Sequence, residues 1–392
     1  MMLVRKLDIW RLKLAFQLPV KHNLKTHTGS ENIVVKVTTA GGLSGYGEGI
    51  PRDFVTGETM AESLKFLEGT LAPAFMNRSF ETPQALKAAL AESWLDPKAA
   101  ACPGAFCALE CALLDAGGKT WNLPVADIIG PRLKDRVVYS AVLPMASPAQ
   151  MGRLLKVVKD AGMRFLKLKV GDAGDLEMLE MARQALGWEI DLRVDANAAW
   201  SAAEAVERIR EMARFRISSV EQPVAKDDFL GMKQVREGVE VPISADESLC
   251  TEADARRLID LKACQIFNIR LSKCGGLGAS ARILKLAQEA GVRCQLGCHV
   301  GETSILSAAG RAFALCAGDL AYIEGSISPY LLTRDPVENP VLFEGGGLAY
   351  ALPGPGLGVQ PQDNVLCELA VSHFSGSMPR TEGARPAEAV PA

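Results

Sequence analysis

Apolar and polar residues alternate along the first 50 residues of the chain, in LVRKLDIWRLKL, NIVVKVTT and GGLSGYGEG. Alternation over such lengths predicts β-strands, and the glycine-rich joins predict turns. Helical periodicity follows between about residues 58 and 122, where Gly117 and Gly118 predict a helix end. Residues 1–130 are therefore expected to form an α+β unit, with an antiparallel sheet first and helices after it.

Residues 131–330 show a different pattern, in which short apolar strands alternate with amphipathic helical segments. The expected strands cover residues 136–143, 164–170, 191–196, 217–222, 242–247, 265–269, 293–298 and 321–325. The step is nearly constant, because 26 residues separate Lys169 from Asp195 and another 26 lead to Glu221. A further 25 residues lead to Asp246. Eight such units in one run favour a closed parallel (β/α) barrel over an open doubly wound sheet, which would also alternate.

Two segments follow the expected barrel. Residues 331–374 are rich in proline and glycine, as in LFEGGGLAYALPGPGLGV, and we expect them to return to the first unit. Residues 375–392 contain few large apolar side chains. Such a composition cannot form a core, so a disordered tail is expected there.

The charge, hydropathy and cysteine content of the chain exclude several classes of protein. The formal net charge is −3, with 48% hydrophobic and 23% charged residues, which argues against a nucleic-acid binder or a protein held on an anionic membrane. No apolar stretch is long enough for a membrane span, and the charged start MMLVRKLDIW is unlike a signal peptide. The ten cysteines are scattered without a CxxC pair, which is typical of reduced thiols. A cytoplasmic location is therefore expected.

Three acidic residues end consecutive expected strands: Asp195, Glu221 and Asp246. Parallel strands of a barrel end at one face, so these carboxylates should meet there. Three carboxylates in one place repel unless a cation neutralises them, and oxygen ligands with open positions suit Mg²⁺. Each acid could instead be a helix cap or a loop residue, and Asp246 in the segment DES is a plausible cap. Because the three acids occupy the same position in successive β/α units, the metal site is the favoured interpretation.

Lysines stand on either side of this predicted site. Lys167 and Lys169 lie two apart in one strand and so share a face, where each positive charge should depress the pKa of the other. A lysine that is partly neutral can serve as a general base. Lys273 follows the sixth strand and would face the second strand across the barrel. Solvated lysines on an exposed strand or loop are the alternative interpretation.

Other polar residues near strand ends carry weaker signals. Asn197 shares the face of Asp195 and could orient a ligand, whereas Glu247 is ambiguous. His299 and Glu302 follow the seventh strand, and Glu324 ends the eighth. Each could meet a substrate or serve as a cap. The segment GYGEG lacks the GxGxxG spacing of a dinucleotide site, and neither a P-loop nor a GxSxG motif is present.

Five ordered segments together resemble the enolase superfamily, in its muconate-lactonizing-enzyme subgroup of muconate cycloisomerases, dipeptide epimerases and amino-acid racemases. The segments are FLKLKVG (165–171), RVDANAAW (193–200), VEQPV (220–224), ADES (245–248) and IRLSKCGG (269–276). The resemblance covers nearly the whole chain to about residue 360. It implies an α/β fold, a modified (β/α) TIM-type barrel at 131–330 beneath an α+β capping domain built from residues 1–130 and 331–374.

The same resemblance implies roles for individual residues. Asp195, Glu221 and Asp246 would bind one Mg²⁺ per active site, with Mn²⁺ as a possible substitute, and Lys169 and Lys273 would be the acid/base pair. Lys167 would lie beside a metal-bound carboxylate, and Asn197 and Glu247 would surround the ligands. Loops 20–31 and 50–59 would set specificity. Substrate contacts are expected from Lys167, Asn197, His27, Glu302 and Glu324.

A racemase or epimerase is the function that this set favours. It would abstract the α-proton of a carboxylate substrate, an amino-acid or imino-acid derivative, through a metal-stabilised enolate. A cycloisomerase or a syn-dehydratase is the alternative on the same scaffold, and a non-catalytic barrel is a third. The related dipeptide epimerases usually carry an acidic DxD pair at the eighth strand, where this chain has Glu324 alone. That departure argues against a dipeptide. Barrels of this kind often assemble as homo-oligomers.

Overall fold

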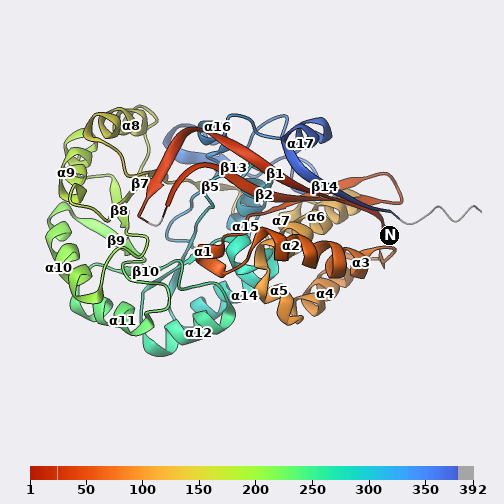
Figure 1. The fold of residues 1–392 in the computed structure, drawn as a ribbon, viewed down its shortest axis with the longest axis horizontal. Helices are drawn as coiled ribbons and strands as arrows, with labels where there is room; N and C mark the ends of the chain where they lie inside the picture. Colours follow the sequence, from red (N-terminus) through yellow and green to blue (C-terminus); the bar gives the residue numbers. More distant parts are fainter. Residues whose placement is uncertain (24, 378–392) are drawn as a thin grey trace, which may run out of the picture.

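The computed structural model describes residues 1–23 and 25–377. Its first layer is an antiparallel sheet in the order β14-β1-β2-β3, with β4 paired to β1. The strands are β1 (Met2–His22), β2 (Lys25–Thr39), β3 (Ser44–Gly49), β4 (Ser79–Phe80) and β14 (Ala370–Ser377). Strands β1 and β2 form a long hairpin whose far end reaches over the barrel near β7 (Figure 1). Because β14 pairs with β1, the end of the described chain returns to its beginning.

Helix α6 (Pro103–Trp121) packs directly against β3. The contact is close enough to require glycine, because a Cβ at Gly47 would stand 2.1 Å from the backbone oxygen of Ala108. The segment GYGEG therefore serves helix packing. The helix end predicted at Gly117 and Gly118 is wrong, since α6 continues to Trp121 and ends where Asn122 takes a left-handed conformation.

Shorter helices and turns complete the cap and its links to the barrel. They are α1 (Asp53–Thr56), α2 (Met60–Phe66), η1 (Leu67–Leu71), α3 (Ala72–Phe75), α4 (Pro83–Trp94), α5 (Pro97–Ala101), α7 (Val125–Ile129), η3 (Gly345–Gly347) and α17 (Asp363–Leu369). Their buried side chains join one continuous hydrophobic core that extends from the sheet into the barrel.

Seven parallel strands form the barrel sheet in the sequential order β12-β11-β10-β9-β8-β7-β6. They are β6 (Ala141–Leu143), β7 (Phe165–Lys169), β8 (Asp191–Asp195), β9 (Ile217–Glu221), β10 (Ile243–Ala245), β11 (Ile266–Ile269) and β12 (Arg293–Leu296). The eighth expected strand closes the ring with isolated bonds: Leu296 N donates to Tyr322 O (3.0 Å), and Ser140 N donates to Ile323 O (2.8 Å). The expected modified TIM-type barrel with an α+β cap is confirmed.

Two of the expected strands differ in detail. Residues 136–143 split into β5 (Arg136–Val138) and β6, because β5 pairs antiparallel with β13 (Leu348–Tyr350) outside the barrel sheet. Residues 321–325 make ladder bonds to β12 but only one bridge, Leu296 with Ile323. The tail expected from residue 375 starts too early, since β14 runs to Ser377, and residues 378–392 lie outside the described residues.

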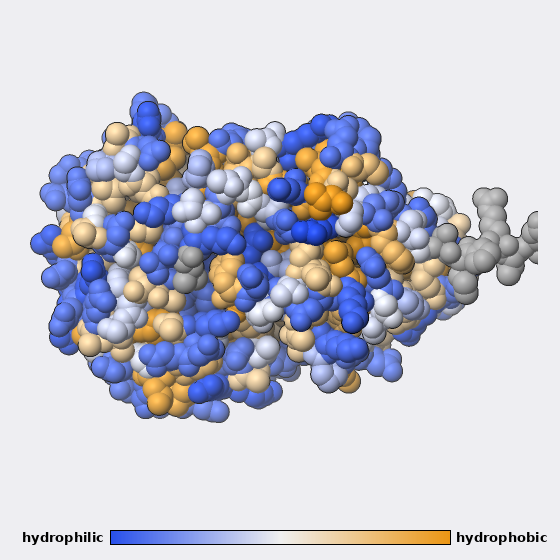
Figure 2. Space-filling view, in the orientation of Figure 1, coloured by the Kyte–Doolittle hydropathy of each residue, from blue (hydrophilic) through white to orange (hydrophobic). Residues whose placement is uncertain are grey.

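Helices surround the parallel sheet (Figure 1). They are α8 (Pro148–Asp160), α9 (Asp175–Leu186), α10 (Ala202–Met212), η2 (Ala213–Phe215), α11 (Phe229–Gly238), α12 (Glu252–Leu261), α13 (Leu271–Cys274), α14 (Gly276–Glu289), α15 (Ser304–Cys316) and α16 (Ser328–Leu331). On the face of the molecule that Figure 2 shows, hydrophilic residues predominate and hydrophobic residues are scattered among them. Among the described helices, none combines the length and apolar character that a membrane span needs.

Two buried glutamates of the cap hold barrel helices by their N-termini. Glu48 accepts hydrogen bonds from the backbone of Thr303 (3.0 Å) and Leu306 (3.0 Å) at the start of α15. Glu110 accepts bonds from the backbone of Leu277 (2.5 Å) and Gly278 (3.1 Å) at the start of α14. Burial raises the pKa of both carboxyl groups to about 7. The cap is therefore fixed in register on the barrel.

Replacing Glu48 with alanine is expected to destabilise the fold by about 2–4 kcal/mol, because the buried donors at the start of α15 and the Asn32 amide would lose their acceptor. Urea unfolding would measure the loss. The exposed Glu211 of α10 offers a matched control, and its replacement with alanine should stay within about 0.5 kcal/mol. Equal stabilities of the two variants would contradict the role of Glu48.

Candidate active site

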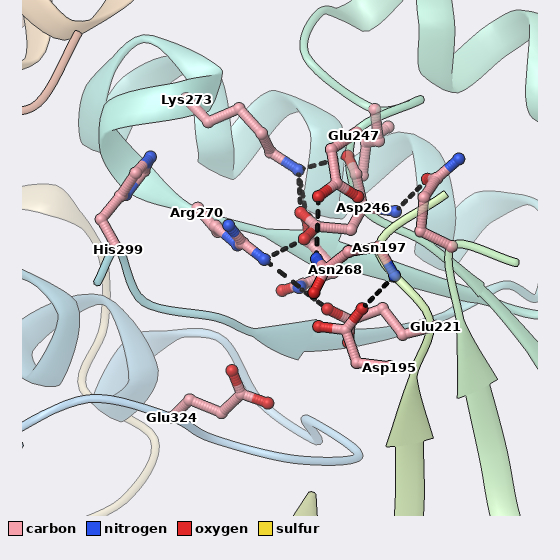
Figure 3. A network of polar contacts seen from close by, with 12 residues as sticks. Asp195, Asn197, Glu221, Asp246, Glu247, Asn268, Arg270, Lys273, His299 and Glu324 are labelled. Atoms are coloured by element: carbon pink, nitrogen blue, oxygen red, sulfur yellow. Dashed lines mark hydrogen bonds and ion pairs between the residues drawn. The ribbon is translucent and has the colours of Figure 1, made fainter. Parts of the chain in front are cut away.

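Three carboxylates meet at the carboxyl end of the barrel sheet. Asp195 ends β8, Glu221 ends β9 and Asp246 follows β10, and each side chain is fully buried. Their possible ligand atoms all lie within 4.8 Å of one another. Figure 3 shows the three acids gathered on neighbouring strands. The constant step of the β/α units thus brings them together as the sequence predicts.

This cluster is chemically suited to a divalent cation. Burial, together with the charges of Glu221 and Asp246, raises the pKa of Asp195. A bound cation would therefore stabilise the ionised form of these carboxylates. Two further buried oxygens face no hydrogen-bond partner among the described residues, Glu247 Oε2 and Asn268 Oδ1. All-oxygen donors of this kind prefer Mg²⁺ or Mn²⁺ to softer metals.

Two lysines stand on opposite sides of the cluster. Lys169, at the end of β7, places Nζ 2.5 Å from Asp195 and 2.8 Å from Asn197 Oδ1. Lys273, in α13 after β11, places Nζ 2.8 Å from Asp246 Oδ1. Because β8, β9 and β10 lie between β7 and β11 in the sheet, the acids separate the two amines.

Lys167 lies deeper in the barrel than Lys169. Its Nζ is 3.1 Å from Glu221 and 2.8 Å from Glu324, and Arg193 lies 2.5 Å from Glu324. Burial alone would lower the pKa of Lys167, but the nearby carboxylates outweigh it and raise the pKa. The expected depression of its pKa by Lys169 is therefore wrong. Lys167 and Glu324, expected at the substrate, contact each other in a buried network.

Most of the other predicted residues form hydrogen bonds with side chains or the backbone of this chain. Asn197 joins Lys169 to Glu247, donating to Glu247 Oε1 over 3.1 Å. Burial, Asp246 and Asp195 raise the pKa of Glu247 to about 7. Glu302 accepts bonds from Ser307 Oγ (2.8 Å) and the backbone of His299 (3.1 Å). Burial raises the pKa of Glu302 to about 8.

The capping loops close over the cluster. His27 lies 3.0 Å from His22 between their Nε2 atoms, and both rings pack beside Phe54. Burial and the neighbouring cations lower the pKa of His27 to about 4 and that of His22 to about 3, so both rings are neutral at pH 7. The hairpin is fastened to the barrel, where Asn23 donates to the backbone oxygen of Asn197 (3.3 Å).

Four polar residues of the site were not predicted from the sequence. Arg270 is ion-paired with Asp246 and lies 3.6 Å from Glu221, and Figure 3 shows it directed at the acids. The others are Arg193, Asn268 and Gln295, the last two donating to Glu221. Spacing could have revealed two of them. Arg193 lies two residues before Asp195 in one strand, and Arg270 lies one helical turn before Lys273.

Family models match both parts of the chain. Residues 6–130 match the N-terminal domain of the mandelate racemase / muconate lactonizing enzyme family. Residues 150–365 match the enolase C-terminal domain-like model. The first match covers the N-terminal part of the cap, and the second covers the barrel from α8 onward and continues into the segment that follows it.

Curated relatives and solved structures are similar over most of their length. N-succinyl-L-Arg/Lys racemase of Bacillus cereus is 30% identical over 94% of this chain and 98% of its own. Its crystal structure superposes with a TM-score of 0.88 at 29% identity, over 96% of this chain and 100% of that one. A dipeptide epimerase of Enterococcus faecalis, solved with Mg and L-Leu-L-Tyr, has a TM-score of 0.84 at 29% identity, over 92% and 100%. Muconate cycloisomerase 1-2 of Acinetobacter lwoffii is 28% identical over 83% of this chain and 85% of its own.

Proposed function

The chain belongs to the mandelate racemase and muconate lactonizing enzyme family of the enolase superfamily, and we propose that it is a Mg²⁺-dependent racemase or epimerase. Its substrate is a carboxylate with an acidic α-proton, an amino-acid or imino-acid derivative. One observation carries the proposal: Lys169 and Lys273 flank a buried cluster of three carboxylates.

Asp195, Glu221 and Asp246 would hold the ion, and Glu247 and Asn197 would support it from the side. When bound, Mg²⁺ supplies positive charge that stabilises the substrate carboxylate as its α-proton leaves. Buried Lys167 compensates part of the negative charge of the acids from below. Glu221 is oriented by Asn268 (2.9 Å) and Gln295 (2.6 Å), which keeps its carboxylate in one position.

The two lysines move the proton. One ε-amine removes the α-proton from one face of the substrate, and the other ε-ammonium returns a proton to the opposite face, which inverts the configuration. Hydrogen bonds position each amine: Lys169 by Asn197, and Lys273 by the backbone oxygens of Asp246 (2.6 Å) and Asn268 (2.9 Å). For the reverse reaction the lysines exchange roles.

A cycloisomerase or syn-dehydratase is the second candidate, because the muconate cycloisomerase relative is similar over most of this chain. Such reactions need one base and a leaving group at the β-carbon. Two amines on opposite sides of the acids favour inversion instead. The non-catalytic alternative has no support, since the lysines and acids are all present and assembled.

Proton exchange tests the proposal. Incubation with Mg²⁺ and a panel of N-acylated and cyclic amino acids in D₂O should replace the α-proton with deuterium, followed by NMR, and should invert the configuration. Absence of exchange across the panel would contradict the proposed function. A product of new mass or with a new ultraviolet chromophore would instead identify the lyase or cycloisomerase. A cytoplasmic location and homo-oligomeric assembly stay predictions.

A further inference from the structure

A cavity lies between the cap and the outer helices of the barrel, away from the acid cluster. Its volume is about 280 Å³, and α4, α6, α14, α15 and the end of α7 form its walls. Figure 1 shows α14 on the side of the barrel that faces the cap helices. Ala91 of α4 and Ala281 of α14 line the cavity and are exposed, so it opens to solvent between these two helices. Neither the three acids nor the two catalytic lysines line it.

The inner walls of this cavity are apolar. Helix α4 contributes Leu90 and Trp94, α6 contributes Phe106 and Leu114, and α15 contributes Phe313. The rings of Trp94 and Phe106 meet edge to face, with their centroids 4.9 Å apart. Apolar cavities are poorly hydrated and take up apolar groups, because such a group leaves water when it enters. The walls therefore suit a hydrocarbon group.

Contacts between the cap and the barrel keep the walls in place. Glu110 of α6 accepts hydrogen bonds from the backbone of Leu277 and Gly278 at the start of α14. The ring of Trp94 packs on the turn before α14, where a Cβ at Gly275 would stand 1.9 Å from it. Both α4 and α6 are thus fixed against the barrel. A ligand would enter a space that is already formed, which lowers the cost of binding.

One cation in the wall has hydrogen-bond donors to spare. Arg282 of α14 donates from Nε to Glu252 Oε1 over 2.5 Å, and its guanidinium carbon lies 5.9 Å from the centre of the Trp94 ring. Its Nη2 is buried and faces no hydrogen-bond acceptor among the described residues. A buried donor without an acceptor is unfavourable, and the planar fork of a guanidinium matches a carboxylate. The free end of Arg282 therefore favours an anionic group in the cavity.

The other charges of the wall agree with this preference. Lys87 of α4 adds a second positive charge. Glu110 also lines the cavity, but its oxygens are bound by the backbone of α14, and burial raises its pKa to about 7. Lys87 and Arg282 are thus opposed only by Glu252 and a partly protonated Glu110. The wall keeps positive charge for a carboxylate.

We propose that this cavity binds a free medium-chain fatty acid, with its alkyl chain among α4, α6 and α15 and its carboxylate on the Nη nitrogens of Arg282. A small polar anion such as phosphate would leave the apolar walls unfilled, and a neutral hydrocarbon would leave Nη2 of Arg282 without an acceptor. An amphiphilic carboxylate satisfies both. The site is separate from the acid cluster, so it does not depend on the proposed function.

Calorimetry of the Mg²⁺-loaded protein with hexanoate, octanoate and decanoate tests the proposal. Each added methylene should tighten binding by roughly 4-fold until the cavity is filled. Decanoate should bind at least roughly 10-fold more tightly than decanol, because only the carboxylate makes a charge-assisted bond. Arg282→Met should abolish this preference and leave the affinity for decanol unchanged. Arg256→Met, which removes an exposed arginine of α12, should change neither affinity.

A blocking variant shows where the ligand binds. Ala91→Phe should fill the cavity and abolish decanoate binding, whereas Ala88→Phe, at an exposed position of the same helix outside the lining, should not. Unchanged decanoate affinity in both Arg282→Met and Ala91→Phe would place the ligand elsewhere, such as on the catalytic ion, and overturn the inference.

Three further outcomes would also overturn it. The first is absence of decanoate binding below the concentration at which decanoate forms micelles. The second is an equal loss of decanoate and decanol binding in Arg282→Met, which would show a merely structural role. The third is a change in the sedimentation velocity of Ala91→Phe, which would show that a second copy of the chain covers the opening.

Discussion

Lys169→Ala is expected to slow racemisation by roughly 1,000-fold, within the usual range for the loss of a general acid–base catalyst. The variant would lack the amine that Asp195 and Asn197 hold at the end of β7, while the acids and Lys273 stay in place. Lys273→Ala should cause a similar loss. Polarimetry with either enantiomer of a substrate measures both effects.

Exchange of the α-proton for deuterium shows which lysine acts on which enantiomer. A variant with one lysine can still remove and return a proton on the face that the remaining amine reaches. Each variant should therefore exchange the α-proton of one enantiomer in D₂O without inverting it, and Lys169→Ala and Lys273→Ala should act on opposite enantiomers. Exchange of the same enantiomer by both variants would contradict a two-base reaction.

Controls exclude a general loss of structure. Lys156→Ala removes a lysine that is 73% exposed on α8 and should leave kcat unchanged. Because Lys273 is fully buried against Asp246, its variant also requires a thermal unfolding measurement. A folded Lys273→Ala with normal racemisation would exclude the lysine from the reaction.

Much of the barrel could be predicted because its physics is local and periodic. Buried parallel strands are short and apolar, and they end at one face, so a constant step of 25 or 26 residues is enough to bring Asp195, Glu221 and Asp246 together. The alternation of β7 likewise placed Lys167 and Lys169 on one side. These inferences need only the period of a strand and the order of the units.

Contacts between distant segments could not be predicted in this way. Glu324 lies 157 residues from Lys167 and 131 from Arg193, and their pairing depends on how the ring closes. The charge of Glu324 is therefore neutralised by partners that no local pattern of the sequence reveals. Whether a charged side chain has an oppositely charged partner depends on which distant segments the fold brings together.

Asp195→Asn is expected to weaken Mg²⁺ binding by at least roughly 100-fold. Loss of a group that only supports a metal ligand already costs about 10- to 100-fold in affinity, and Asp195 is one of three direct donors in the cluster. Asparagine keeps the shape of the side chain but removes its charge, so the fold should persist. Calorimetric titration with Mg²⁺ or Mn²⁺ measures the affinity independently of turnover.

Thermal unfolding provides a second reading of the same prediction. An ion present at 100 times its Kd stabilises the native state by about 2.7 kcal/mol, and EDTA should remove that stabilisation from the wild type. Asp195→Asn should show little stabilisation at the same Mg²⁺ concentration and little racemisation. Asp191→Asn is the matched control, because Asp191 begins the same strand and contacts Tyr322 far from the cluster. Wild-type Mg²⁺ affinity in Asp195→Asn, or full activity of the wild type in EDTA, would show that these three acids do not bind a catalytic ion.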